Sequence, residues 1–256
     1  MQLIDSHTHL YLPEFDDDRD EIISRALKNN VTKMLLPNIN KDSVEPMISM
    51  VGNYPGICYP MIGIHPTSVK DDYEEQLEAV NKNLQKNNFI AIGETGIDLY
   101  RDKKYIKQQE AAFLEQLKIA SRENLPVVIH SRESLEEILT LLDSTPLDDL
   151  RGVFHAFTGN IEQAREIINR GFLLGIGGIL TFKNSDLDKT IKSIEVEKLI
   201  LETDSPYLAP VPKRGKRNES SYVRFIAERL AEIKNLKVEE IARISTSNCK
   251  ALFSLD

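Results

Sequence analysis

The sequence predicts an α/β fold, a closed (β/α)8 TIM barrel. Two observations favour it. Short apolar, β-branched runs alternate almost strictly with longer amphipathic runs, which is typical of a parallel sheet with helical crossovers. About eight such units fit into 256 residues, the usual size of one barrel. We therefore expect residues 1–256 to form a single domain. The alternative arrangement is an open, doubly wound sheet.

The elements follow one another in order along the chain. Eight runs rich in Val, Ile, Leu and Phe are expected strands: Leu3–Asp5, Lys33–Pro37, Cys58–Ile64, Phe89–Gly93, Pro126–Ile129, Gly152–Phe154, Phe172–Ile176 and Lys198–Glu202. Between and after them, apolar residues recur at helical spacing, as at Phe113, Leu117 and Ala120. The expected helices are Asp18–Lys28, Ser43–Val51, Glu74–Lys86, Tyr105–Glu123, Ser134–Leu142, Ile161–Arg170, Leu187–Ile194, Ser221–Ile233 and Val238–Phe253.

Composition excludes several classes of protein. A hydrophobic content of 41% is ample for a core and argues against disorder. The net charge is −8, whereas proteins that coat nucleic acid without sequence preference are usually basic. Extended wrapping of a polyanion is therefore not expected. An acidic enzyme can still act on a polyanion where positive charge is supplied locally.

The termini and cysteines indicate the compartment. Cys58 and Cys249 form no CxxC pair and are expected to be small buried residues of a protein in a reducing compartment. The N-terminus has neither the basic nor the apolar region of a signal peptide. No run reaches the roughly 18 apolar residues of a membrane span. We expect a cytoplasmic protein without membrane contact or an obligate protein partner.

The five histidines of the chain all follow expected strands. Two acidic residues, one after the fourth strand and one after the eighth, have the same placement. In a parallel barrel these strand ends meet at one rim, so residues almost 200 positions apart can share a site. The expected site residues are His7, His9, His65, Glu94, His130, His155 and Asp204.

This combination of residues predicts a metal site at the carboxyl-terminal rim. Four imidazoles and two carboxylates exceed the three protein ligands of a catalytic zinc, so we expect two divalent ions bridged by Glu94. His7, His9 and Asp204 are assigned to one ion, and His130 and His155 to the other. Such ligands suit Zn²⁺, Mn²⁺ or iron and tolerate Mg²⁺ less well, so the identity of the metal stays open among Mg²⁺, Mn²⁺ and Zn²⁺.

The stretch Ser205–Ser220 is rich in proline and basic residues and follows the last expected strand. Its basic run, Lys213–Arg217, is either a phosphate-binding loop or simply a solvated one. The candidates for phosphate contacts are Arg132 and Arg214, with Arg101 a weaker choice. Tyr207 and Phe157 are candidates for stacking on a base, or else packing residues.

The local motifs resemble those of the TatD family of metal-dependent deoxyribonucleases, in the amidohydrolase superfamily. The matching stretches run from Ile4 to Glu219 and are DSHTHL, GIHP, IGETGID, PVVIHSRE, FHAFTG, GGILTF and ETDSPYLAP followed by KRGKRNE. Hydantoinase-like and phosphotriesterase-like relatives carry a carboxylated lysine after strand four, where this chain has Glu94. One departure is Ser220 after Asn218-Glu219, where the family commonly has proline, so the shape of that loop is in doubt.

The resemblance implies hydrolysis of phosphodiester bonds in single-stranded DNA, and in RNA as a further substrate, through water activated by two metal ions. It implies that His7, His9, Glu94, His130, His155 and Asp204 are ligands and that His65 lies in the substrate pocket. Asp204 would accept the proton of the water, and His65 would bind the phosphate or protonate the leaving oxygen. Few basic anchors favour trimming from an end by an exonuclease.

Two other functions stay open. The same centre can serve a hydrolase of a non-nucleic ester, lactone or amide. A binding protein on a decayed scaffold is disfavoured, because every ligand position is filled.

Overall fold

The computed structural model is described for residues 1–100, 103–145, 147 and 149–256. Its strands are β1 (Leu3–Asp5), β2 (Val31–Pro37), β3 (Cys58–Met61), β4 (Ile92–Asp98), β5 (Val127–Arg132), β6 (Gly152–Phe154), β7 (Leu173–Ile176) and β8 (Leu199–Leu201). Its helices are α1 (Arg19–Lys28), α2 (Val44–Asn53), α3 (Tyr73–Leu84), α4 (Ile106–Glu123), α5 (Leu135–Ser144), α6 (Ile161–Asn169), α7 (Leu187–Lys192), α8 (Val223–Lys234) and α9 (Val238–Phe253). In these residues, no helix combines the length and apolar character needed to cross a bilayer.

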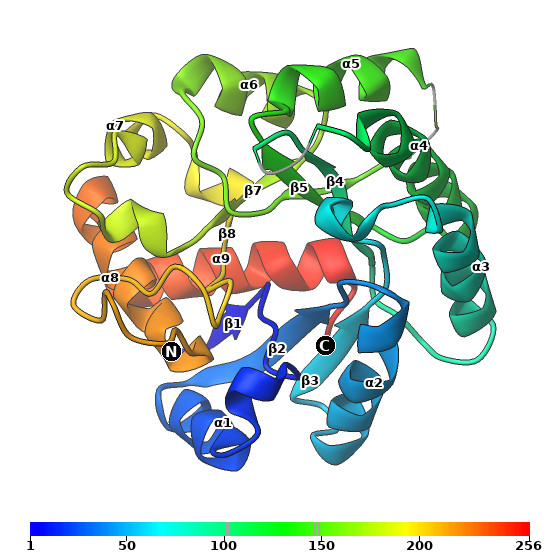
Figure 1. The fold of residues 1–256 in the computed structure, drawn as a ribbon. Coiled ribbons are helices and arrows are strands. Elements are labelled where there is room, and N and C mark those ends of the chain that lie inside the picture. Colours follow the sequence, from blue (N-terminus) through cyan, green and yellow to red (C-terminus); the bar gives the residue numbers. More distant parts are fainter. Residues whose placement is uncertain (101–102, 146, 148) are drawn as a thin grey trace.

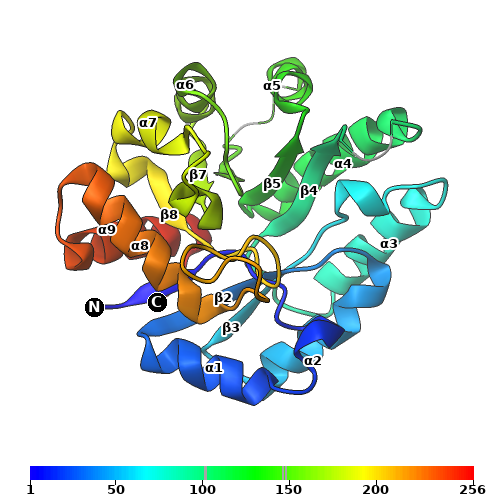
Figure 2. The same cartoon turned by 60° about the vertical axis from the view of Figure 1, so that its left-hand side comes forward.

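The strands form a parallel (β/α)8 barrel surrounded by helices (Figures 1 and 2). Strands β1–β3 pair in one group and β4–β8 in another, every pair being parallel. Both seams are joined by backbone hydrogen bonds. Ile62 N donates to Ala91 O (3.1 Å) between β3 and β4, and Ser6 N donates to Leu201 O (3.0 Å) between β8 and β1. The predicted fold is confirmed, and the open sheet is wrong.

Two hydrophobic layers hold the barrel. The larger layer fills the space between strands and helices, with residues such as Phe113 of α4 fully buried. The smaller cluster lies inside the barrel and is capped by α9, the helix coloured red in Figure 1. Its buried members are Ile4, Leu35, Met61, Ala91, Val128, Val153, Ile200, Cys249, Leu252 and Phe253. Along the chain, Ala91, Val128 and Val153 each precede a site residue by two or three positions, so this cluster lies beneath the rim.

Local sequence signals explain several helix boundaries. Asn160 caps α6 by accepting a hydrogen bond from Gln163 N (2.9 Å), and the Gln163 side chain accepts one from Asn160 N in return. Helix α4 ends at Glu123 and is capped by Asn124, whose φ of 52° lies in the left-handed region that asparagine tolerates. The Arg25 guanidinium of α1 bonds both oxygens of Glu219 (2.8–3.2 Å), which anchors the loop that follows β8.

Two predicted strand boundaries are wrong. We expected a strand over Phe89–Gly93, but β4 spans Ile92–Asp98 and contains Glu94. We expected the fifth strand to stop at Ile129, but β5 continues to Arg132, so His130 lies within it. In both cases the strand continues into polar residues that include members of the site, Glu94 and Asp98 in β4 and His130 in β5. Strands β1 and β6 and helix α9 have the predicted bounds, and the other predicted elements are present with shifted ends.

Candidate metal centre

Glu94 lies at the centre of the site. Its side chain is 2% exposed, and its two oxygens are surrounded by imidazoles. Oε1 lies 2.7 Å from His155 Nε2 and 2.9 Å from His130 Nδ1. Oε2 lies 3.1 Å from His7 Nε2 and 3.6 Å from His9 Nε2. One carboxylate oxygen therefore faces each of the two histidine pairs that the sequence predicts.

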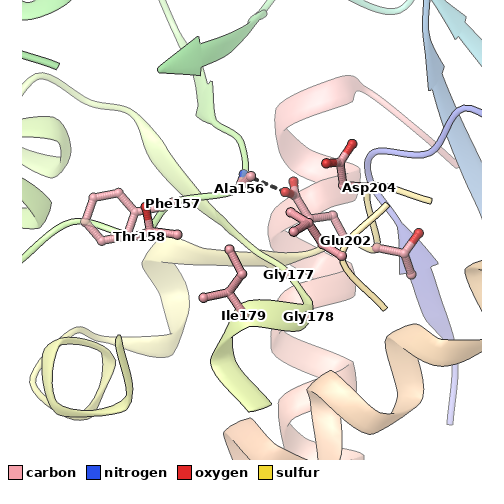
Figure 3. A pocket seen from close by; sticks show the side chains of 10 residues that line it. Ala156, Phe157, Thr158, Gly177, Gly178, Ile179, Glu202 and Asp204 are labelled. Atoms are coloured by element: carbon pink, nitrogen blue, oxygen red, sulfur yellow. Dashed lines mark hydrogen bonds between the residues drawn. The ribbon is translucent and has the colours of Figure 1, made fainter. Parts of the chain in front are cut away.

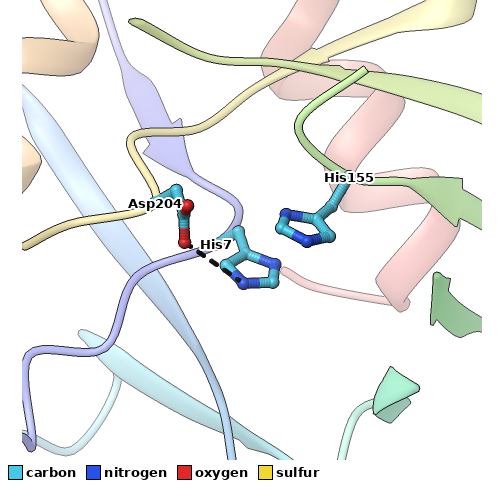
Figure 4. A group of neighbouring side chains, drawn as sticks. All are labelled: His7, His155 and Asp204. Atoms are coloured by element: carbon cyan, nitrogen blue, oxygen red, sulfur yellow. Dashed lines mark ion pairs between the residues drawn. The ribbon is translucent and has the colours of Figure 1, made fainter. Parts of the chain in front are cut away.

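The barrel brings these residues together from different strands. His7 and His9 follow β1, His155 follows β6, and Asp204 follows β8. Figure 4 shows His7 between Asp204 and His155: the His7 ring stacks on the His155 ring with centroids 3.9 Å apart, and His7 Nε2 lies 3.8 Å from Asp204 Oδ1. Asp204 has a φ of 54°, and its backbone N–H donates to His7 O (2.9 Å).

The spacing of the donor atoms suits divalent metals. Nitrogen and oxygen ligands at about 2.0–2.2 Å from one ion lie roughly 3.0–3.5 Å from one another. Three groups of residues each offer ligand atoms within 4.8 Å of one another: His7, His9 and Glu94; His7, His155 and Asp204; and His65, Glu94 and His130. The residues present can hold a metal ion.

In each site histidine, the inner ring nitrogen faces Glu94 and the outer one faces away from it. A neutral ring carries one N–H and one lone pair, so the hydrogen bond of the outer nitrogen determines whether the inner nitrogen carries a proton or a lone pair. Tyr11 Oη donates its hydrogen to Pro37 O (2.6 Å), so it accepts from His9 Nδ1 (3.2 Å). His9 Nε2 then turns a lone pair toward Glu94 and Asp204. His9 is thus prepared as a ligand.

His65 has the opposite arrangement. Its Nδ1 accepts the backbone N–H of Thr67 (3.1 Å), so the proton is on Nε2. Nε2 lies 3.2 Å from Glu94 Oε1 and faces the site as a hydrogen-bond donor. Although His65 belongs to one of the three possible ligand groups, a protonated nitrogen has no lone pair for a metal. This agrees with the substrate-pocket role that the resemblance implies.

Charge within the site favours ionised carboxylates. Burial raises the pKa of Glu94, but the surrounding histidines, His155 foremost, outweigh burial and hold that pKa well below its usual range. Burial opposes ionisation of Asp204 too, and the neighbouring imidazoles, His9 foremost, outweigh burial and lower its pKa. Burial lowers the pKa of His7 and His65. Both carboxylates are therefore available to bind a cation.

Asp204 is the more open of the two carboxylates. Its side chain is 16% exposed, compared with 2% for Glu94. It borders a small cavity between the segments after β6, β7 and β8, which Figure 3 shows with Ala156, Gly177 and Glu202. A water molecule arriving from solvent therefore has easier access to Asp204 than to Glu94.

The predicted substrate contacts lie around the rim. The Arg132 guanidinium lies 3.7 Å above the Tyr100 ring, and that of Arg214 lies 4.1 Å above the Phe182 ring. Tyr207 is 48% exposed, with its ring 6.3 Å from that of His9. All three have surface open to a ligand.

One other predicted contact, Phe157, is not available, and one cannot be judged. Phe157 is only 6% exposed and belongs to the core. Arg217 of the basic run binds both oxygens of Asp18 (2.6 and 2.8 Å), so it anchors the loop to α1. Arg101 lies outside the described residues.

Sequence reasoning missed the residues behind the histidines. They are Tyr11 behind His9, Asp98 behind His130 (Oδ2 to Nε2, 3.1 Å) and Glu202 behind His155 (Oε1 to Nδ1, 3.5 Å). Each stands inside or directly beside a motif that contains a site residue. Their place in these motifs was the available sequence signal for a role at the site. It does not predict which histidine nitrogen each side chain contacts.

Comparison with known proteins agrees with this geometry. The family model described as TatD related DNase matches residues 4–254. The chain belongs to the TatD family. One TatD relative, from Bacillus subtilis, is the "uncharacterized metal-dependent hydrolase YabD", 38% identical over 99% of this chain and 100% of that protein. Another, from Salmonella typhimurium, is named "3′-5′ ssDNA/RNA exonuclease TatD", 32% identical over 99% of both.

A solved TatD structure supports the fold. The crystal structure of YJJV, a TatD homolog from Escherichia coli K12, superimposes with a TM-score of 0.93 at 28% identity, covering 99% of this chain and 98% of that one. Together with its relatives, this makes the chain a metal-dependent hydrolase of the TatD family.

Proposed function

We propose that this TatD hydrolase is a deoxyribonuclease that trims single-stranded DNA from an end, with RNA as a second substrate, using two divalent ions drawn from Mg²⁺, Mn²⁺ and Zn²⁺. The observation that carries the proposal is Glu94, with one oxygen toward His7 and His9 and the other toward His130 and His155. Such a carboxylate can bridge two metals. The ligand set is the one predicted from sequence, completed by Asp204.

The metals would supply an acidified water and neutralise charge on the phosphate. Asp204 would accept the proton of that water, since it is the exposed carboxylate of the site. His65 would direct its Nε2 proton at the phosphate or the leaving oxygen, because Thr67 occupies its other nitrogen. Glu94, buried among imidazoles, would stay ionised throughout.

Two arginines favour a phosphodiester over an uncharged ester. The Arg132 and Arg214 guanidinium groups each lie over an aromatic ring, and an arginine held in this way can bind two phosphate oxygens with a pair of N–H groups. Tyr207, beside His9, offers an exposed ring on which a base could stack. These groups suit a short length of single strand.

Attack from an end is favoured by the groove next to His155. This groove, about 440 Å³ in volume, is lined by Phe157, Gln163 and three exposed carboxylates, Glu133, Glu136 and Glu137. These carboxylates repel the phosphates of any strand that continues on this side. A strand with a terminus at the metal centre avoids that repulsion.

The test is digestion of a single-stranded DNA oligonucleotide labelled at either end, with Mg²⁺ or Mn²⁺. We expect a ladder that shortens from one end with the wild type and background cleavage with Glu94→Ala, because loss of the bridge removes the metals. Glu239→Ala, an exposed carboxylate change on α9, is the matched control and should cleave like the wild type. No cleavage by metal-loaded wild type would contradict the proposal and favour an amide, lactone or ester substrate.

A further inference from the structure

Two of the site histidines have a buried carboxylate behind them, on the side away from Glu94. Asp98 Oδ2 lies 3.1 Å from His130 Nε2, and Glu202 Oε1 lies 3.5 Å from His155 Nδ1. Asp98 is 3% exposed and Glu202 is fully buried. Burying a carboxylate is costly unless it is bound by a partner, so both positions call for an explanation.

Asp98 is fixed in place by β4 and α4. Its Oδ1 accepts the backbone N–H of Tyr100 (3.0 Å), and its own backbone N–H donates to Gln109 Oε1 (2.9 Å). Its second oxygen is thereby aimed at His130. The carboxylate cannot follow the ring if the ring turns, so it defines the orientation of the ring.

Glu202 is fixed between β6 and β8. Its Oε1 accepts the backbone N–H of Ala156 (2.5 Å), the residue after His155 (Figure 3). The space for its other oxygen exists because residue 175 is glycine: a Cβ there would lie 2.4 Å from Glu202 Oε2. Among the described residues, His155 Nδ1 and Glu202 Oε2 are buried polar atoms without a hydrogen-bond partner. A small rotation of the ring would bring His155 Nδ1 to hydrogen-bond distance of the carboxylate.

The two carboxylates hold opposite nitrogens. Glu202 faces Nδ1 of His155, which leaves Nε2 pointing at Glu94 (2.7 Å), whereas Asp98 faces Nε2 of His130, which leaves Nδ1 pointing at Glu94 (2.9 Å). When a metal ion replaces the proton between each inner nitrogen and Glu94, a carboxylate that accepts the outer N–H favours the tautomer whose lone pair is turned inward. Without this selection, half of the ring orientations and tautomers would present an N–H to the centre.

We propose that Asp98 and Glu202 are positioning residues that hold His130 and His155 in their metal-binding tautomers. The inference rests on the proposed metal centre and deepens it. A carboxylate that accepts the outer N–H makes the imidazole a better donor and fixes its direction. Among the described residues, neither carboxylate belongs to the three groups of possible metal ligands.

Asp5 provides a matched control. It is as buried as Glu202 and lies beneath the same rim, but its oxygens accept from Thr203 N (2.8 Å) and Thr203 Oγ1 (2.6 Å) instead of from a ring. Asp5→Asn thus removes a buried carboxylate of the same region without removing the partner of a histidine. Comparison with Asp5→Asn therefore distinguishes the loss of a histidine partner from the loss of any buried carboxylate in this region.

The test measures Mn²⁺ affinity by electron paramagnetic resonance on the metal-free, full-length wild type and on Glu202→Gln, Asp98→Asn and Asp5→Asn. We expect Glu202→Gln and Asp98→Asn to weaken binding of one ion by roughly 10–100-fold, with Asp5→Asn close to the wild type. In the Zn²⁺-loaded wild type, nitrogen-15 NMR should show one protected proton on His155 Nδ1 and one on His130 Nε2. Each should exchange faster in the corresponding variant.

Two results would overturn the inference while leaving the metal centre intact: wild-type affinity in both variants, or an equal loss in Asp5→Asn. Absence of Mn²⁺ binding by the wild type would instead contradict the proposed function itself. Circular dichroism of each metal-free variant checks that it is folded. Because the two carboxylates come from different strands, a folding failure in one variant still leaves the other as a test.

Discussion

The two thiols of the chain show how burial sets the chemistry of a single residue. Cys58 is 2% exposed and Cys249 is 1% exposed. Burial raises the pKa of the Cys58 thiol to about 12 and raises that of Cys249 as well. The thiolate is the reactive form of cysteine. Both residues should therefore be inert in the folded protein, as the sequence predicts for small core residues.

We expect no reaction of the native protein with Ellman's reagent at mildly alkaline pH, because neither thiol ionises or meets solvent. Two thiols should react at once after unfolding in guanidinium chloride, which serves as the control. Rapid labelling of a native thiol would contradict the burial of that residue and point to local opening of the β3 or α9 region.

Residue identity predicted which groups gather at the site but not how each is oriented. The histidines and both acids converge as expected, because parallel strands bring their ends to one rim. The tautomers depend on Tyr11, Thr67, Asp98 and Glu202, whose reach to a particular ring nitrogen follows from three-dimensional placement alone. Periodicity and motif spacing contain no information about that placement.

At the scale of the element, β4 shows why strand ends were misjudged. Its residues Glu94, Thr95 and Asp98 are polar, yet all seven residues from Ile92 to Asp98 are buried. Polar residues usually indicate a loop, but here the inside of the barrel supplies imidazole partners for the two carboxylates. Strand β4 therefore continues through polar residues that have partners inside the barrel. Sequence patterns do not reveal those partners.

Strand β7 gives a direct test of close packing beneath the site. A Cβ at Gly175 would lie 2.4 Å from Glu202 Oε2 and 3.0 Å from His155 Cα. We expect Gly175→Ala to displace Glu202, to lower the free energy of unfolding by about 1–3 kcal/mol through overpacking and to weaken metal binding. Urea unfolding and Mn²⁺ titration measure the two effects.

Gly177→Ala is the matched control for that change. It lies just after the same strand, and the nearest atom to its added Cβ would be 3.8 Å away, an ordinary contact. If Gly175→Ala and Gly177→Ala lost equal stability and affinity, the close fit of Glu202 against β7 would be disproved.

At the scale of the whole molecule, one end of the barrel is plugged and the other carries the site. Residues of α9 complete the interior cluster beneath the rim, and Thr246 Oγ1 of α9 donates to Gln2 O (3.0 Å), next to β1. The alternation of strands and helices predicted the barrel, but a ninth helix after the eighth strand gave no sign of its position. Only the closed structure shows that its apolar end faces the barrel interior.

Because α9 closes the end of the barrel opposite the site, a substitution in α9 can test the stability of the fold separately from metal binding. Phe253 is 3% exposed within the interior cluster, so Phe253→Ala should lower the free energy of unfolding by about 3–5 kcal/mol. Mn²⁺ affinity of the folded variant should stay unchanged, because the substitution lies beneath the site and touches no ligand.

Leu236→Ala, a 36% exposed leucine after α8, is the control and should lower the free energy of unfolding by no more than about 0.5 kcal/mol. A Phe253→Ala loss as small as that of the control, measured by urea unfolding, would show that α9 does not support the barrel. A parallel loss of metal affinity would show that the plug and the rim act as one unit.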